Sequence, residues 1–190
     1  MTEPSARAEP ATPAPAEVLL VGDPRLRQPA AAMGGRVSPE HESDIARLHA
    51  TLAAFRAAHG FGRAIAAPQI GVPLRAIALE LGDGPFTMVD PEITWRSAET
   101  MTLWDDCMSF PWLMVRVARH RSISVRYRTP AGATRELDRL DAATSELLQH
   151  EIDHLDGVLA LDRALDREAV VARAVLERDP ARFRAMVDHH

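Results

Sequence analysis

Apolar side chains recur at helical spacing between Ser38 and Gly60. They lie three or four residues apart, so a helix would bring them to one face. Ser38 is a typical helix N-cap, Pro39 suits the first helical position, and Gly60 suits the position after the last turn. The pattern predicts an amphipathic helix of about five turns. Its apolar face consists of Ile45, Leu48, Leu52 and Phe55.

The pattern changes after Gln69 to short apolar or alternating segments, separated by Gly, Pro and Asp. Between Ile123 and Arg128, apolar and polar residues alternate with the period of a strand that buries one face. Such segments predict short antiparallel strands. The predicted strands are Ala76–Leu81, Phe86–Trp95, Leu113–Tyr127 and Ala133–Leu140.

Helical spacing returns in the last third of the chain. One helix is predicted from Asp141 to Gly157, and residues 167–190 predict a further helical segment that Pro180 interrupts. Helices and short antiparallel strands together predict an α+β fold. We expect small antiparallel sheets packed around the helix after Asp141, with one helix from the N-terminal part of the chain and one from the C-terminal part.

A chain of 190 residues with 46% hydrophobic content is expected to form one domain. Residues 1–16 are rich in Pro and Ala and contain no apolar core segment, so we expect a disordered tail there. The folded domain is expected to span residues 17–166. Residues 167–190 are expected to be a helical extension of the same domain.

The composition restricts the possible partners. A formal charge of -5 gives no electrostatic support for direct binding of nucleic acid or of an anionic membrane. All 22 basic residues are Arg, which excludes Schiff-base chemistry and a phosphate-loop lysine. The single cysteine cannot form an internal disulfide, and a free thiol favours a cytoplasmic location.

The predicted helix after Asp141 contains the sequence His-Glu-Ile-Asp-His. His150 and His154 are four residues apart, so a helix places both imidazoles on one face, where they can share a metal ion. Glu151 lies between them and is placed to act as a general base and acid. The alternative is a solvated helix in which the two His residues occur together by chance.

A catalytic metal of this kind needs a third protein ligand and one open position. Cys107 is the only cysteine in the sequence. A lone Cys is more often an inert buried residue. The presence of a metal-binding helix in the same chain nevertheless favours a role for Cys107 as a metal ligand. A third segment runs from Gly62 to Gly71 and contains small residues and Gln69, whose amide can donate a hydrogen bond. Its alternative interpretation is a tightly packed loop.

These three segments, in this order, resemble the three motifs of the peptide deformylase family: a glycine and alanine run ending in Gln, a Cys followed by Ser, and the metal-binding helix. The flanking segments Val21–Arg27 and Asp153–Arg163 also resemble the family. The resemblance covers about residues 18–165.

The resemblance implies a hydrolase of protein biosynthesis that removes the formyl group from the N-terminal formylmethionine of nascent peptides and releases formate. It implies that Cys107, His150 and His154 bind one divalent metal ion, Fe(II) in the first place and Zn(II) or another ion as alternatives. Glu151 would act as base and acid, and the Gln69 amide and the Met108 backbone N–H would stabilise negative charge on the carbonyl oxygen.

The same resemblance implies a substrate-binding wall, a structural ion pair between Arg119 and Asp105, and transient contact with the ribosome. Asp153 is expected to orient its own helix or a neighbouring Arg. The residues expected to bind the substrate are Gly62, Arg63, Ala64, Asp106 and Leu147.

The first and second motifs depart from the usual pattern of the family. Where this chain has Ala64, the family usually has Gly, and where it has Arg63, the family has an apolar residue. Where this chain has Asp105-Asp106, the family has Glu-Gly. One alternative is therefore an amidase that acts on another formylated or acylated peptide or metabolite. A second alternative is a non-catalytic metal-binding relative, although Glu151 and Gln69 are not needed merely to hold a metal. A third alternative is a general metalloprotease, but the third downstream His that such an enzyme would have is missing.

Overall fold

The computed structural model describes residues 13–189, which form the α+β fold that the sequence predicts. The strands make two sheets in which every pairing is antiparallel: one has the order β1-β2-β3-β6-β7 and the other the order β4-β5-β8. The strands are β1 (Ala64–Ala66), β2 (Ala76–Glu80), β3 (Pro85–Arg96), β4 (Thr100–Asp105), β5 (Leu113–His120), β6 (Ile123–Arg128), β7 (Thr134–Leu137) and β8 (Val170–Ala172).

Four α-helices and three short 3-10 helices complete the described part of the chain. Within residues 13–189, no helix combines the length and the apolar character needed to cross a membrane. The helices are α1 (Pro39–His59), α2 (Ala142–Leu155), α3 (Arg173–Arg178), α4 (Pro180–Arg184), η1 (Pro24–Arg27), η2 (Ala67–Ile70) and η3 (Ala160–Arg163).

Helix α1 begins and ends where its sequence predicts. The Ser38 side chain accepts a hydrogen bond from the His41 N–H, and Pro39 occupies the first turn. Gly60 ends the helix in the left-handed conformation with φ of 76°. The buried side chains of α1 pack against β1, β2 and η2; they are Leu48, Leu52 and Phe55, together with Thr51.

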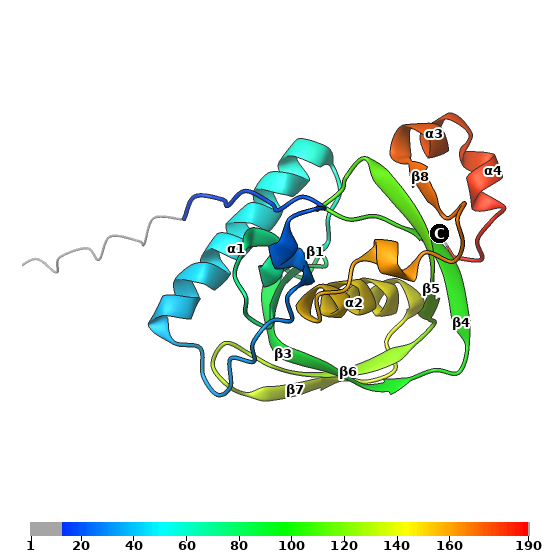
Figure 1. Ribbon diagram of the computed structural model, residues 1–190. Coiled ribbons are helices and arrows are strands. Elements are labelled where there is room, and N and C mark those ends of the chain that lie inside the picture. The colour runs from blue at the N-terminus through cyan, green and yellow to red at the C-terminus, as the bar shows by residue number, and fades with distance from the viewer. Residues whose placement is uncertain (1–12, 190) are drawn as a thin grey trace, which may run out of the picture.

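Helix α2 lies at the centre of the fold, enclosed between the two sheets (Figure 1). Asp141 caps its first turn by accepting from the Thr144 N–H. Every residue from Ser145 to Leu155 is buried. One side of the helix contributes apolar residues to the core with the five-stranded sheet. Other sides carry polar residues, such as Asp153, which pairs with Arg119 of β5. This position allows α2 to carry polar side chains into the interior.

The single strand predicted over Leu113–Tyr127 is wrong. The chain turns at Arg121-Ser122, so β5 ends at His120 in one sheet and β6 begins at Ile123 in the other. At this corner the His120 backbone forms its hydrogen bonds with the Gln149 side chain of α2. The Gln149 Oε1 accepts from the His120 N–H, and the Gln149 Nε2 donates to the His120 carbonyl, both at 2.9 Å. The corner therefore depends on a distant side chain that a local pattern does not contain.

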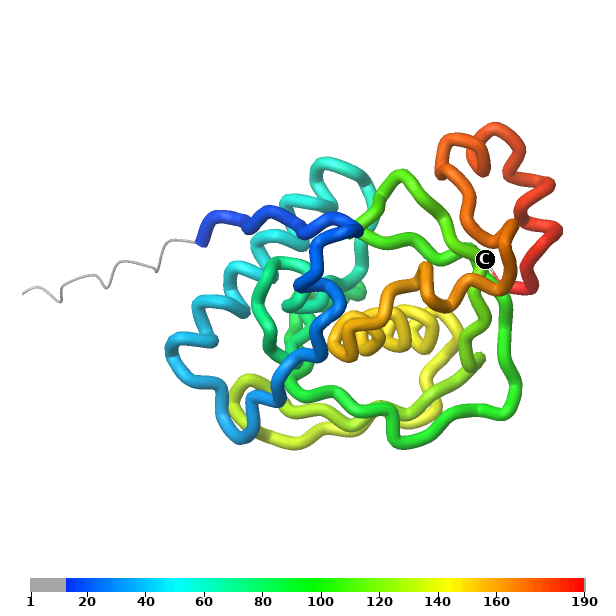
Figure 2. The backbone as a smooth tube through the Cα atoms, viewed as in Figure 1, coloured from blue at the N-terminus to red at the C-terminus, as the bar shows by residue number. Residues whose placement is uncertain are grey.

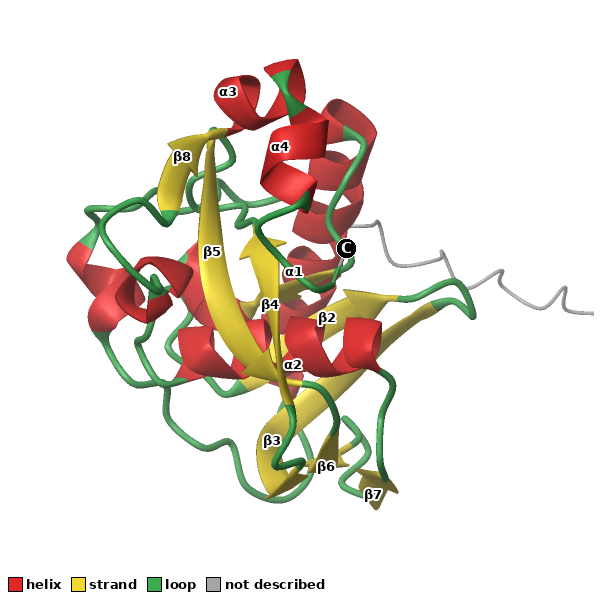
Figure 3. Ribbon diagram, turned by 90° about the vertical axis from the view of Figure 1, so that its right-hand side faces the viewer, coloured by secondary structure: helices red, strands yellow, loops and turns green. Residues whose placement is uncertain are grey.

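The C-terminal segment also differs from its prediction. Instead of being helical from residue 167, it first forms β8, which pairs with β5 and extends the smaller sheet (Figure 3). Helices α3 and α4 follow, separated at Asp179-Pro180. The Trp104 indole donates to the Phe183 carbonyl at 2.8 Å, which ties α4 to β4. Residue 190 lies outside the described residues.

Most of the predicted tail, residues 1–12, lies outside the described residues. From Ala16 the backbone is bonded to the fold: the Ala16 N–H donates to Thr51 Oγ1, and the Leu19 N–H donates to the Gln69 carbonyl, both at 2.8 Å. The Val21 N–H donates to the Ser109 carbonyl at 2.8 Å. Figure 2 shows this segment, in dark blue, crossing α1. It therefore supports two loops that border the candidate site.

A buried ion network joins the two sides of α2. Arg119 of β5 is 3% exposed and donates to Asp105 of β4 at 2.8 Å and to Asp153 of α2 at 2.5 Å. Arg163 of η3 donates twice to the same Asp153 carboxylate, at 2.6 Å each. The expected Arg119–Asp105 pair is thus confirmed, and the network fixes β4, β5, α2 and η3 relative to one another.

Replacing Arg119 should destabilise the protein strongly. The Arg119→Met variant keeps most of the side-chain volume but removes the guanidinium that the buried Asp105 and Asp153 carboxylates share. Removing one partner of a buried ion pair costs about 3–5 kcal/mol. We expect a loss of this size in the free energy of unfolding, measured by urea denaturation.

The matched control is Arg126→Met. Arg126 pairs with Glu92 at 2.7 Å, but both side chains are more than half exposed, and exposed pairs contribute about 0–1 kcal/mol. Equal losses in the two variants would contradict the structural role of the buried network.

Candidate metal centre and active site

Three potential metal ligands converge beside α2. His150 and His154 project from successive turns of the helix, and their Nε2 atoms are 3.2 Å apart. The Cys107 Sγ lies 3.2 Å from His154 Nε2. All three side chains are buried, and their ligand atoms lie within 4.8 Å of one another. The structure therefore brings together the three residues that the sequence predicts as ligands.

Cys107 reaches this point because β4 ends at Asp105, two residues before it. The chain then turns, with the Phe110 N–H donating to the Cys107 carbonyl at 3.1 Å. Two donors face the sulfur: the Ser109 N–H at 3.4 Å and the Gln69 amide at 3.6 Å. The second motif and the glycine and alanine run therefore each contribute a hydrogen-bond donor to the sulfur.

The Asp105 carboxylate orients the first imidazole. Its Oδ1 lies 2.9 Å from His150 Nδ1, while its Oδ2 accepts from Arg119. Burial acts to raise the pKa of Asp105, but His150 and Arg119 hold that pKa well below its usual range. A carboxylate next to Nδ1 favours a proton there and leaves the Nε2 lone pair directed toward Cys107 and His154.

The second imidazole is favoured in its neutral form. Burial lowers the pKa of His154 well below its usual value, and the neighbouring His150 lowers it further. For His150, burial opposes the charged form but Asp105 raises its pKa well above the usual value. His154 thus offers a lone pair, and His150 offers one when Nδ1 carries its single proton.

The spacing of the donor atoms fits a bound divalent cation. Metal–nitrogen bonds of about 2.0–2.1 Å and metal–sulfur bonds of about 2.3 Å separate the ligand atoms of a tetrahedral site by roughly 3.3–3.6 Å. The separations of His154 Nε2 from Cys107 Sγ and from His150 Nε2, 3.2 Å each, are close to these values, and all three ligand atoms lie within 4.8 Å of one another. Thiolate and imidazole donors suit Fe(II) and Zn(II) alike. The three residues therefore have the chemistry and the arrangement of a metal site with room for a further ligand.

Glu151 lies beside this cluster and is 3% exposed. Its Oε2 has no hydrogen-bond partner among residues 13–189. Burial raises the pKa of Glu151 to about 7, so near neutral pH its carboxyl group can both accept and release a proton. An unpaired buried carboxyl group needs an explanation, and a role in proton transfer supplies one.

Gln69 lies in η2, at the end of the glycine and alanine run. Its Oε1 accepts from the Ala66 N–H at 2.9 Å, which fixes the orientation of the amide. The amide nitrogen then points toward the second motif and donates to Ser109 Oγ at 3.2 Å. Gln69 is 1% exposed. The run therefore does more than form a packed loop, because it holds an amide donor next to the sulfur.

The residues expected to bind substrate line one small cavity of about 50 Å³ with the chemical groups above. Gly62 has φ of +109°, and a Cβ there would lie 2.5 Å from the Met108 methyl group. Asp106 is held by Arg173, whose guanidinium donates to it at 2.9 Å. The cavity includes Gly62, Arg63, Ala64, Asp106, Met108 and Leu147, in addition to Gln69, Cys107, His150 and Glu151.

A larger groove of about 910 Å³ runs along α1 and is bordered by Glu80 and Pro85. None of the residues that line it belongs to the Cys107 cluster. The candidate site is therefore identified by the chemistry of its donor atoms and not by the size of its cavity.

Two residues of the site are not among those that the sequence predicts for it. Glu146 lines the small cavity and pairs with Arg63. Its position four residues before His150, on the same side of α2, was a signal for it. Ser109 accepts from the Gln69 amide, and its place two residues after Cys107 could have suggested a contact with the sulfur.

Comparison with known proteins agrees with this arrangement. The sequence model of the family described as polypeptide deformylase matches residues 15–170. A peptide deformylase of Thermotoga petrophila is 33% identical over 159 residues, which are 84% of this chain and 93% of the relative.

Solved structures give the same result. A peptide deformylase of Thermotoga maritima superposes with a TM-score of 0.71 at 32% identity, covering 80% of this chain and 99% of that one. An Acinetobacter baumannii peptide deformylase with Met-Ala-Ser bound has a TM-score of 0.70 at 27% identity, covering 78% and 98%. Sequence, fold and the geometry of the site all lead to one conclusion: this chain belongs to the peptide deformylase family.

Proposed function

We propose that this protein hydrolyses the formamide bond of N-formylmethionyl peptides, using a divalent ion held by Cys107, His150 and His154 and the side chains of Glu151 and Gln69. One observation carries the proposal. A buried thiol and two buried imidazoles converge at metal-binding distances, and the thiol and the His150 imidazole line the same small cavity as an oriented amide donor and a carboxyl group whose Oε2 has no partner among the described residues. Holding a metal requires only the first three groups, whereas amide hydrolysis requires all five.

Fe(II) is the proposed ion, because the resemblance to the family favours it, and Zn(II) is the alternative that the same donors accept. When bound, the ion supplies Lewis acidity to water and to the carbonyl oxygen. Cys107, His150 and His154 would hold the ion with one sulfur and two nitrogen donors. Asp105 supports this set by keeping the proton of His150 on Nδ1.

Glu151 is proposed to move the proton in both halves of the reaction. It first accepts a proton from the water whose oxygen bonds to the formyl carbon. It then gives this proton to the amide nitrogen as the carbon–nitrogen bond breaks, so formate and a free amino terminus leave. Its pKa near 7 suits both steps at neutral pH.

The Gln69 amide and the Met108 backbone N–H are proposed to stabilise the charge that collects on the formyl oxygen. The Gln69 Nε2 is oriented in advance, since its Oε1 is bonded to the Ala66 N–H. Donors that are held in place before reaction stabilise a developing charge without reorganisation. Met108 follows Cys107 directly, so its N–H belongs to the same turn as the sulfur.

The proposed substrate is a nascent peptide in the cytoplasm, and contact with the ribosome would be transient. The Acinetobacter baumannii relative with Met-Ala-Ser bound supports a peptide that carries a free amino-terminal methionine as the product. The proposed function is tested by formate release from formyl-Met-Ala-Ser, with protein loaded anaerobically with Fe(II) and an N-acetyl peptide for comparison. Absence of formate despite one bound metal ion per chain would overturn it.

The Glu151→Gln variant should bind the metal as well as the unmodified protein but lose turnover. The amide keeps the size of the side chain and cannot accept and return the proton. We expect the rate of formate release to fall by about 10²–10⁴-fold, with unchanged metal content by elemental analysis.

Glu177→Gln, on the exposed side of α3, is the matched control and should leave the rate unchanged. A Glu151→Gln variant with full metal content and a rate within threefold of the unmodified protein would contradict the proton-transfer role.

The Cys107→Ala variant should fail to retain the metal during purification. Two imidazoles without the thiolate leave the ion with only two of its three protein ligands. Elemental analysis should give one ion per chain for the unmodified protein and well below one for the variant.

The control for this variant is Ser109→Ala, which removes a hydrogen-bond acceptor of Gln69 but no proposed ligand. It should keep its metal. Equal metal content in Cys107→Ala and the unmodified protein would exclude Cys107 as a ligand.

A further inference from the structure

An ion pair forms part of the wall of the candidate active site. The Arg63 guanidinium donates through Nη2 to the Glu146 carboxylate and through Nη1 to the Ala143 carbonyl at 3.0 Å. Glu146 is the more buried partner, with a side chain that is 11% exposed against 45% for Arg63. Burial raises the pKa of Glu146 and Arg63 opposes this. Arg63 lies in the segment that also contains Gln69, and Glu146 lies on α2 together with Glu151.

The pair lies between two spaces. On one side is the cavity of about 50 Å³ that contains the Cys107 sulfur and Glu151. On the other side is a groove of about 350 Å³ toward the C-terminal segment, with Leu103, Trp104 and Met114 along it. Arg63 and Glu146 line both spaces, and so do Asp105 and Asp106.

The volumes of the cavity and of the groove indicate which part of a substrate each can hold. The inner cavity is far below the roughly 300–1,000 Å³ of pockets that enclose small organic ligands, so it suits little more than the formyl group. The adjoining groove is large enough for an amino-acid side chain. A peptide whose formyl group reaches the ligand cluster therefore places the side chain of its first residue against the Arg63–Glu146 pair.

The pair makes this position polar. An apolar side chain packed there removes water from a guanidinium and a carboxylate without replacing the lost hydrogen bonds, which is unfavourable. A side chain with a donor and an acceptor can replace them. An amide oxygen can accept from Arg63, which uses only two of its five N–H groups in the contacts above, and an amide N–H can donate to Glu146.

We propose that Arg63 and Glu146 determine specificity, and that the groove accepts a polar side chain with both a donor and an acceptor, such as an amide, at least as well as that of methionine. This inference rests on the proposed function, since it concerns the residue that carries the formyl group. Glu146 thereby becomes a specificity-determining residue of the site.

The test compares kcat/KM for formyl-Gln-Ala-Ser and formyl-Met-Ala-Ser, whose first side chains have similar length and different polarity. The unmodified protein should cleave the glutamine peptide at least as efficiently as the methionine peptide. The double variant Arg63→Ile, Glu146→Ile removes both charges together, so neither is left buried alone. It should prefer the methionine peptide, with a change of at least about tenfold in the ratio of the two kcat/KM values.

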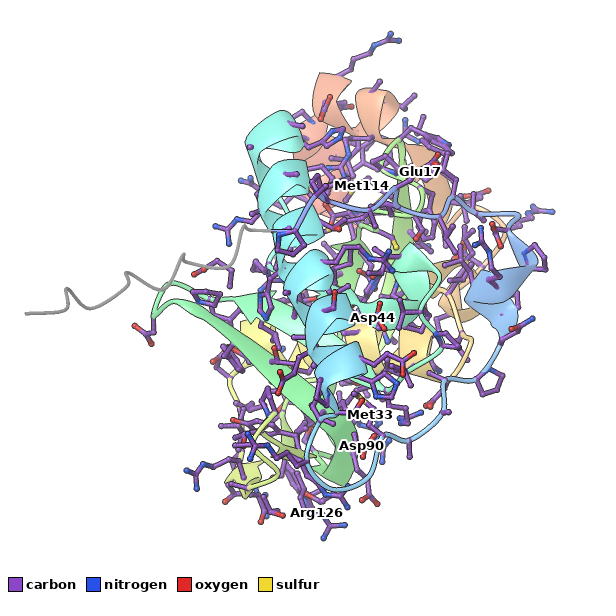
Figure 4. The ribbon with its side chains drawn as sticks, turned by 90° about the vertical axis from the view of Figure 1, so that its left-hand side faces the viewer. Glu17, Met33, Asp44, Asp90, Met114 and Arg126 are labelled. Atoms are coloured by element: carbon purple, nitrogen blue, oxygen red, sulfur yellow. The ribbon has the colours of Figure 1, made fainter. Side chains whose placement is uncertain are left out.

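The control is the double variant Arg126→Ile, Glu92→Ile, which removes an exposed pair. Arg126 lies at the opposite end of the view from Met114, which borders the groove (Figure 4). This control should keep the ratio of the unmodified protein, and circular dichroism verifies that both variants fold.

The possible failures are distinguishable. An unmodified protein that prefers formyl-Met-Ala-Ser tenfold, or a ratio that the Arg63→Ile, Glu146→Ile variant leaves unchanged, would overturn this inference and leave the proposed function standing. Release of no formate from either peptide by the metal-loaded unmodified protein would overturn the proposed function itself.

Discussion

The structure depends on one buried carboxylate, that of Asp105. It touches Arg119 on one side and His150 on the other, so it joins the ion network that fixes the fold to the imidazole that faces the candidate metal position. A carboxylate is stable at such depth only when cationic or hydrogen-bonding groups surround it. The arrangement of β4, β5 and α2 is therefore also the arrangement of the proposed catalytic groups, and neither can change alone.

Local patterns predicted the elements whose ends carry their own signals. Ser38, Pro39 and Gly60 define α1, and Asp141 defines the start of α2. The pattern failed where tertiary contacts decide the structure. It did not separate β5 from β6, because the corner is completed by Gln149 of α2. It missed β4, whose inward positions include Asp105 and so lack a purely apolar face.

The site was predictable to the extent that its residues belong to short motifs. His150, Glu151 and His154 follow from helical spacing, and Cys107 and Gln69 follow from the resemblance to the family. The resemblance to the family also supplied the Asp105–Arg119 pair, but not the contact of Asp105 with His150. The partner of Arg63 was not predicted: it is Glu146, 83 residues away in the chain. Sequence separation hides such pairs, since only the fold brings β1 and α2 together.

The origin of the three candidate ligands has a consequence for assembly. Two of them lie one turn apart on α2, but Cys107 follows β4 and reaches them only after the β4–β5 hairpin has docked on that helix. A flexible chain would have to close a long loop to hold the same ion. Ion binding and folding are therefore thermodynamically linked: a metal that binds only the docked state increases its population by mass action, and metal starvation should lower resistance to heat and proteolysis.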